Sequence, residues 1–109
     1  MPREYKPLIP QSIGEIMDLL ASMMLSAPTF RDAYFTERNV ETEFFALNEG
    51  LGVMRKKLGE ERYDALIDLS HRMRAHFEAD PDDTNGQARS GRKLIREMED
   101  LLKRHAAKT

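Results

Sequence analysis

The chain of 109 residues contains no cysteine. This absence excludes disulfide bonds, thiolate metal sites and a cysteine nucleophile. Tryptophan is also missing, and there are only 5 prolines and 6 glycines. So few helix-breaking residues, with 40% hydrophobic and 33% charged residues, are typical of a helix-rich globular protein and not of a disordered chain. Because this length fits one core, residues 1–109 are predicted to form a single helical domain.

The chain also lacks a strong charge of one sign and a long apolar run. Its net charge of -2 argues against a general polyanion binder. The most apolar N-terminal segment is interrupted by Glu15 and Asp18 and is followed by Pro28. These residues argue against both a secretory signal and a membrane span. By elimination, the sequence predicts a cytoplasmic protein without membrane association.

Hydrophobic residues recur at alternating spacings of three and four, which predicts main helices with one apolar face each. A central pair spans residues 39–79 and folds back at Gly59, because glycine tolerates the left-handed conformation that ends a helix. An earlier helix is predicted over Ile13–Leu25, and a last helix opens near Gln87. The short connection at Gly59 favours antiparallel neighbours. The predicted fold is therefore all-α, an antiparallel bundle of four main helices.

Two segments are predicted to lie outside the main helices on the N-terminal side. Residues 1–11 hold three prolines, which favour an extended, proline-rich arm. The connector Thr29–Arg38 carries Phe30, Tyr34 and Phe35 and is predicted to form a short helix or turn. Large rings are seldom left in water, so this connector is expected to cover one end of the core. The alternative is that the three aromatic residues of this connector form a recognition patch instead of a cover for the core.

Residues 80–86 form an acidic, turn-rich segment that is predicted to be a surface loop. With Gly86 as the turn glycine of a calcium-binding loop, the first and last ligand positions would be Pro81 and Arg92. Neither side chain can coordinate a cation. His71 and His76 lie about 140° apart around a helix and cannot share a metal ion from one face. No metal, cofactor or catalytic site is predicted.

Gly50 and Gly52 stand inside a predicted helix, where each costs about 1 kcal/mol relative to alanine. Two glycines so close together indicate either the close approach of another helix backbone or a local kink. Ser70 lies on the apolar stripe of the next helix. A catalytic role for its hydroxyl would need a histidine base, and only His105 could supply one from another element.

The first helix carries more apolar residues than one core-facing stripe needs, and the aromatic connector follows it. A monomer of this size rarely exposes a large apolar patch, so self-association as a twofold homodimer is predicted. The alternative is that the arm and the last helix bury these side chains. The candidate protein interface consists of Leu19, Met23, Met24, Leu25, Phe30, Tyr34 and Phe35.

The first half of the last helix is basic, which is mildly unfavourable at the positive end of a helix dipole. An anionic partner would explain the cluster, whose candidate anion contacts are Arg89, Arg92, Lys93 and Arg96. The sequence therefore predicts a small cytosolic protein–protein interaction module, self-associating and with an unidentified protein partner. A nucleic-acid-associated regulator using the basic cluster is the alternative, and a small-ligand binder or enzyme is a further one.

Overall fold

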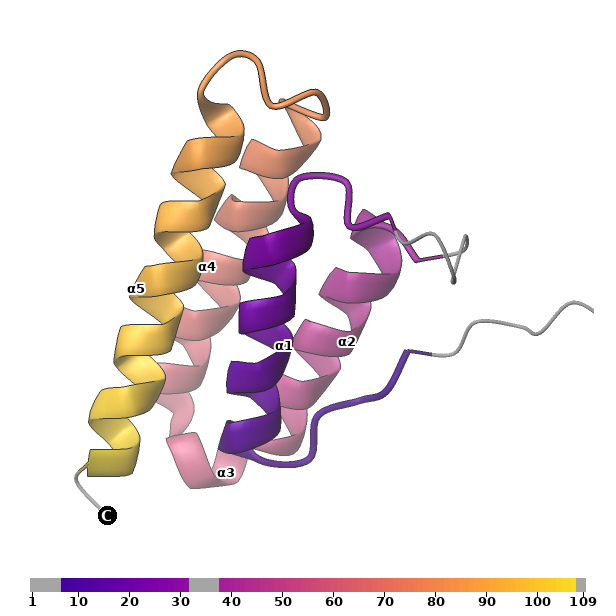
Figure 1. Cartoon of the computed structure of the whole chain (residues 1–109). Helices are drawn as coiled ribbons and strands as arrows, with labels where there is room; N and C mark the ends of the chain where they lie inside the picture. The colour runs from indigo at the N-terminus through magenta and orange to yellow at the C-terminus, as the bar shows by residue number, and fades with distance from the viewer. Residues whose placement is uncertain (1–6, 32–37, 108–109) are drawn as a thin grey trace, which may run out of the picture.

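A computed structural model describes residues 7–31 and 38–107, with side chains up to His105. Over these ranges the protein is all-helical and contains no strand, which confirms the predicted class (Figure 1). The helices are α1 (Ile13–Ser26), α2 (Val40–Val53), α3 (Arg55–Leu58), α4 (Glu60–Glu78) and α5 (Gln87–Ala107). Much of the predicted arm and aromatic connector, including Tyr34 and Phe35, lies outside the described residues.

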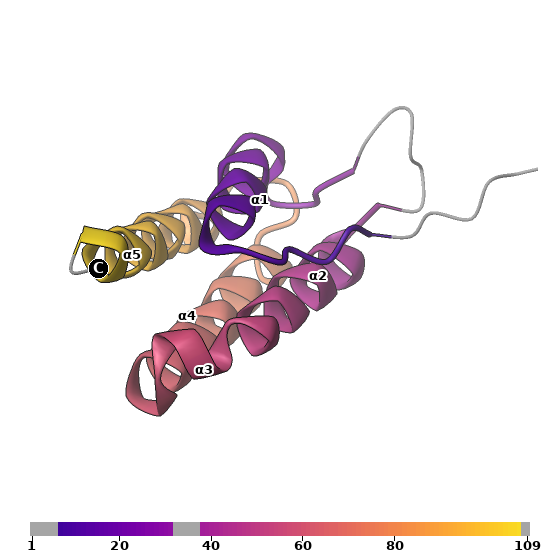
Figure 2. The same ribbon diagram turned by 90° about the horizontal axis from the view of Figure 1, so that it is seen from below.

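The four long helices pack side by side around a shared apolar core. Helices α4 and α5 lie together along their length, α1 packs on α5 and α2, and α2 packs on α4 (Figures 1 and 2). Three phenylalanines meet in the core: Phe30 lies edge-on to Phe44 and Phe77, with ring centroids 5.9 and 5.3 Å away. Phe30 is fully buried, as expected for a connector residue that covers the core.

One predicted boundary is wrong, because a single helix does not continue to Leu58. The chain leaves α-helical geometry at Met54, whose φ and ψ are -91° and 3°. Its N–H donates to the carbonyls of both Gly50 and Leu51, at 3.2 and 3.1 Å, and the short helix α3 follows. The predicted stop at Gly59 is confirmed, since this glycine has a φ of 87°.

Pro10, which precedes α1, explains Gly50. A Cβ atom at this position would lie 3.0 Å from three ring carbons of Pro10, and Pro10 is buried. A close approach therefore exists, but the neighbour is Pro10 and not a helix backbone. Gly52 has nothing within 4 Å of where its Cβ would stand, so no close approach accounts for it.

A buried ion pair ties the start of α2 to the end of α1. Glu43 is only 3% exposed, and Arg38 pairs with its carboxylate. The same guanidinium donates to the hydroxyls of Ser22 and Ser26 on α1, at 3.0 and 3.2 Å. Burying a carboxylate is costly without a partner, so this arginine compensates the charge of Glu43 while it joins the two helices.

Candidate functional site

In the structure, the residues of the predicted protein interface lie in different environments. Met23 and Phe30 are fully buried in the core of this chain. Leu19 and Met24 are partly buried and pack against that core. Leu25 is 88% exposed. Among the described members of the set, Leu25 is thus the most accessible side chain for a partner.

The accessible members of this set also face different directions around α1. The buried residues Ile16 and Leu20 mark the core-facing side of the helix. At about 100° per residue, Leu19 and Met24 stand about 140° apart and flank this side, while Leu25 lies opposite the core. Leu25 stands about 100° from Met24 and about 120° from Leu19 around the helix, so the three side chains do not form one continuous surface. Exposed apolar side chains that the sequence prediction did not include are Leu8, Phe45 and Val53.

Arg92 has a structural role that the sequence did not reveal. Its NH2 group donates to the carbonyl of Ala27 at 3.1 Å and to the carboxylate of Asp83 at 2.9 Å. These bonds link α5 to the end of α1 and to the loop that precedes α5. Arg92 is therefore already engaged within the chain, although it was predicted as an anion contact.

The other three residues of the basic cluster are exposed and lie on one face of α5. Arg89, Lys93 and Arg96 are spaced by four and three residues, which places their side chains on one side of the helix. Over the part of the chain that the structure describes, none of the three has a carboxylate within salt-bridge distance. Together they form a positively charged surface, which we call the α5 basic face.

The loop before α5 is exposed from Pro81 to Gly86, but Asp80 is only 1% exposed. Its carboxylate accepts the backbone N–H groups of Thr84 (2.8 Å), Asn85 (3.3 Å) and Ala88 (3.0 Å). Burial raises the pKa of the Asp80 carboxyl group, but the backbone hydrogen bonds together lower it by a larger amount. The pKa of Asp80 therefore lies below its usual value. Asp80 thus organises the loop and caps α5, so its carboxylate is occupied within the chain.

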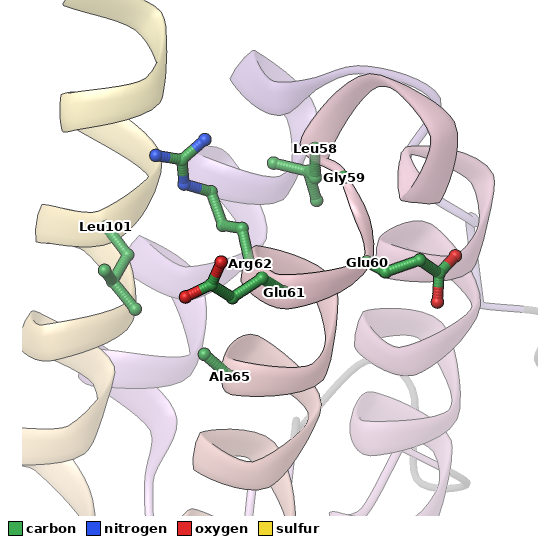
Figure 3. A pocket seen from close by; sticks show the side chains of 7 residues that line it. All are labelled: Leu58, Gly59, Glu60, Glu61, Arg62, Ala65 and Leu101. Carbon is green, nitrogen blue, oxygen red and sulfur yellow. The ribbon is translucent and has the colours of Figure 1, made fainter.

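A cavity of about 500 Å³ lies where α3 turns into α4 (Figure 3). Its lining includes Leu58 of α3, Arg62 and Ala65 of α4, and Leu101 of α5. The side chain of Arg62 extends towards α5 in Figure 3, and its NH1 group lies 2.8 Å from Nδ1 of His105. Arg62 therefore connects this cavity to the C-terminal end of α5.

His105 lines a second cavity of about 450 Å³, which we call the basal cavity. It is formed by the first turn of α1, by α3 and by the end of α5. Its lining residues are Ser12, Ile13, Gly14, Met17, Lys57, Leu102, Lys103 and His105. This lining is largely apolar. It includes two lysines and no carboxylate. The cavity falls within the size range of small-molecule sites.

His105 is 9% exposed, and its Nε2 atom is buried without a hydrogen-bond partner among the described residues. Leaving a buried polar group unsatisfied costs about 1–3 kcal/mol. His105 follows Leu101 and Leu102 by four and three residues, and this helical spacing is a sequence signal for burial of its side chain. No sequence signal indicated its contact with Arg62, which comes from a different helix 43 residues away.

The described residues contain neither a metal-binding cluster nor a membrane-spanning helix. No group of three or more His, Cys, Asp or Glu side chains is arranged to hold a metal ion there. No helix in this part of the chain has the length and apolar character needed to cross a membrane.

Comparisons with known proteins gave no match to a protein family, to a curated protein or to a solved structure.

Proposed function

We propose that the protein is a small helical protein–protein interaction module that self-associates as a homodimer in the cytoplasm. The arrangement we propose for its main helices is an antiparallel bundle of four that presents the outer side of α1 to the second copy. The 88% exposure of Leu25 carries this proposal. Full burial of such a side chain contributes about 1.5–3 kcal/mol, and a protein partner is the ordinary means of burying it.

A twofold dimer suits this surface, because one patch then covers its own copy. Leu25 would meet its counterpart near the axis, and Met24, about 100° away around α1, would lie towards the edge of the contact. Methionine adapts its shape to a facing surface, which favours Met24 in this role. A separate protein partner would use whichever exposed apolar side chains the dimer leaves open, such as Phe45 on α2.

Sedimentation equilibrium at micromolar concentration tests the dimer. Wild type is expected at twice the monomer mass of 12.6 kDa, and Leu25→Glu is expected at the monomer mass with an unchanged helical circular dichroism spectrum. Phe45→Glu is the matched control, since it adds the same charge at an exposed apolar position on α2, and it should remain dimeric. Wild type at 12.6 kDa would refute self-association, and dissociation by Phe45→Glu alone would move the interface to α2.

Nucleic-acid association through the α5 basic face is the second candidate, because Arg89, Lys93 and Arg96 are exposed on one side of α5 and have no ion-pair partner among the described residues. Binding of this kind releases counterions and is strongly salt-dependent. We expect Arg89→Ala with Arg96→Ala to elute from a polyanion column at lower salt than wild type. Lys56→Ala with Arg31→Ala removes the same charge from exposed positions outside α5 and should elute later than that variant. If the two variants elute at the same salt concentration, retention depends on net charge alone, and nucleic-acid association through the α5 basic face is rejected.

A further inference from the structure

The outer side of α2 carries residues that the bundle itself does not use. Phe45 and Val53 are 52% and 49% exposed. Glu41 and Glu49 are exposed acids without an ion-pair partner among the described residues. Gly52 is also exposed, with nothing within 4 Å of where its Cβ would stand. We call these residues the α2 outer face.

The α2 outer face occupies one side of the helix. At about 100° per residue, Gly52 stands about 20° from Phe45, in nearly the same row, and Val53 stands about 80° from Phe45. Glu41 and Glu49 lie about 40° to either side of Phe45. Helix α2 packs on α1, α3 and α4 and forms one edge of the bundle in Figure 2, so these helices leave its outer side open. A helix with apolar residues on every side is normally covered on every side, and this face lacks its cover.

Gly52 indicates that the missing cover comes close to the α2 backbone. Glycine inside a helix is unfavourable relative to alanine. Gly50 and Gly91 are explained by contacts within the chain, whereas Gly52 makes none. Side chains hold two packed helices about 8–10 Å apart, and glycine permits a closer approach of the backbones. A second helix that lies along the row of Phe45 and Gly52 would use this space.

The two glutamates determine which helix fits, because α2 contains no lysine or arginine. A second copy that presented its own α2 outer face would bring Glu41 and Glu49 against the same acids, and phosphate groups would meet the same repulsion. Cationic side chains of a partner would instead pair with both acids while its apolar residues cover Phe45 and Val53. We propose that the α2 outer face binds an amphipathic helix of another protein, whose apolar stripe is flanked by lysine and arginine. Such a partner rests on the interaction module proposed above, although its site is separate from the dimer surface at Leu25.

Titration of the full-length protein with synthetic peptides tests the proposal. The probe is an amphipathic peptide of leucine, alanine and lysine, about 18 residues or five turns long, with its leucines three and four residues apart. Saturable binding is expected by calorimetry, with a Kd on the order of 10 μM. Two related peptides should bind at least about tenfold more weakly. One carries glutamate in place of every lysine, and the other carries central prolines that prevent a helix.

The first pair of variants tests the apolar contact. Phe45→Ala should weaken binding of the lysine peptide about tenfold, because a large aromatic anchor is removed. Leu25→Ala removes an exposed apolar side chain from α1 and should bind the peptide like wild type. Equal weakening by both variants would place the effect outside α2 and overturn the proposal.

The second pair tests the charges. Glu41→Gln together with Glu49→Gln should weaken binding of the lysine peptide about fivefold. Glu97→Gln together with Asp100→Asn removes the same charge from exposed positions on α5 and should change the affinity less than about twofold. If the two double variants bind equally weakly, the peptide responds only to net charge and the proposed site is rejected.

Gly52→Ala separates a binding role from a structural one. The new Cβ would stand in open space in the free protein, so the melting temperature should rise. The same Cβ would obstruct the approaching helix, so binding of the lysine peptide should weaken about tenfold. An unchanged affinity would show that no helix approaches closely at Gly52 and would overturn the proposal.

Other results are equally decisive. The α2 site is rejected if wild type shows no saturable binding of the lysine peptide, or if the glutamate or proline peptide binds as tightly. Dissociation of the dimer by Phe45→Glu would assign the α2 outer face to a second copy and would reject it as well. Self-association is judged separately by sedimentation. A monomeric wild type that binds the lysine peptide refutes the homodimer and supports the α2 site, whereas a dimer that does not bind it refutes the α2 site alone.

Discussion

Met73→Asp is expected to unfold the domain. Met73 lies on α4 and is 0% exposed in the shared core, so the substitution would place a carboxylate among apolar side chains. An unpaired buried charge costs several kcal/mol, against a total stability of about 5–15 kcal/mol for a typical domain. Circular dichroism should show loss of the cooperative thermal transition, or a transition lowered by tens of degrees.

His71→Asp is the control for this substitution. It introduces the same side chain two residues earlier on α4, at an exposed position, and should melt close to wild type. Surface substitutions of this kind usually change stability by no more than about 0.5 kcal/mol. A cooperative transition near the wild-type temperature for Met73→Asp would show that residue 73 does not face the core and that the register of α4 is wrong.

Helix positions could be predicted from the sequence because they depend on local patterns. Apolar spacing located α1, whose N-cap in the structure is Ser12, and Gly59 located the turn before α4. The break at Met54 was missed because the apolar stripe continues through it into α3. The two preceding glycines weakened the helix there, but nothing in the local pattern distinguished a kink from a close contact.

Residues whose roles depend on distant partners could not be predicted. Asp80 was grouped with exposed acids, yet it is buried, and the backbone N–H groups of Thr84, Asn85 and Ala88 turn towards its carboxylate. Arg92 matched its basic neighbours in the sequence, and its contacts with Ala27 and Asp83 separate it from them. The Arg62–His105 contact likewise joins two helices. Such contacts follow from tertiary packing, which composition and periodicity do not encode.

A substitution at Gly91 is also expected to have a large effect on stability, because α5 passes very close to α4 at this residue. A Cβ atom at Gly91 would lie 2.5 Å from Cε1 and 2.8 Å from Cζ of Phe77. The Phe77 ring is itself 0% exposed and packs against Phe30 and Phe44 at 5.3 and 6.4 Å, so it cannot move aside without displacing other core rings. Gly91 precedes Leu94 and Ile95 by three and four residues and so lies on the apolar side of α5, where the Phe77 ring leaves no room for a larger residue.

Gly91→Ala should therefore destabilise the domain by about 1–3 kcal/mol, the usual cost of overpacking a core, even though alanine favours a helix. Gly52→Ala is the matched substitution with the opposite expected sign. Its Cβ would meet nothing within 4 Å, and its φ is not left-handed, so it should stabilise the protein by up to about 1 kcal/mol. Urea unfolding of both variants measures the difference directly. If Gly91→Ala proves as stable as Gly52→Ala, α4 and α5 do not approach each other as closely at Phe77 as the structure places them.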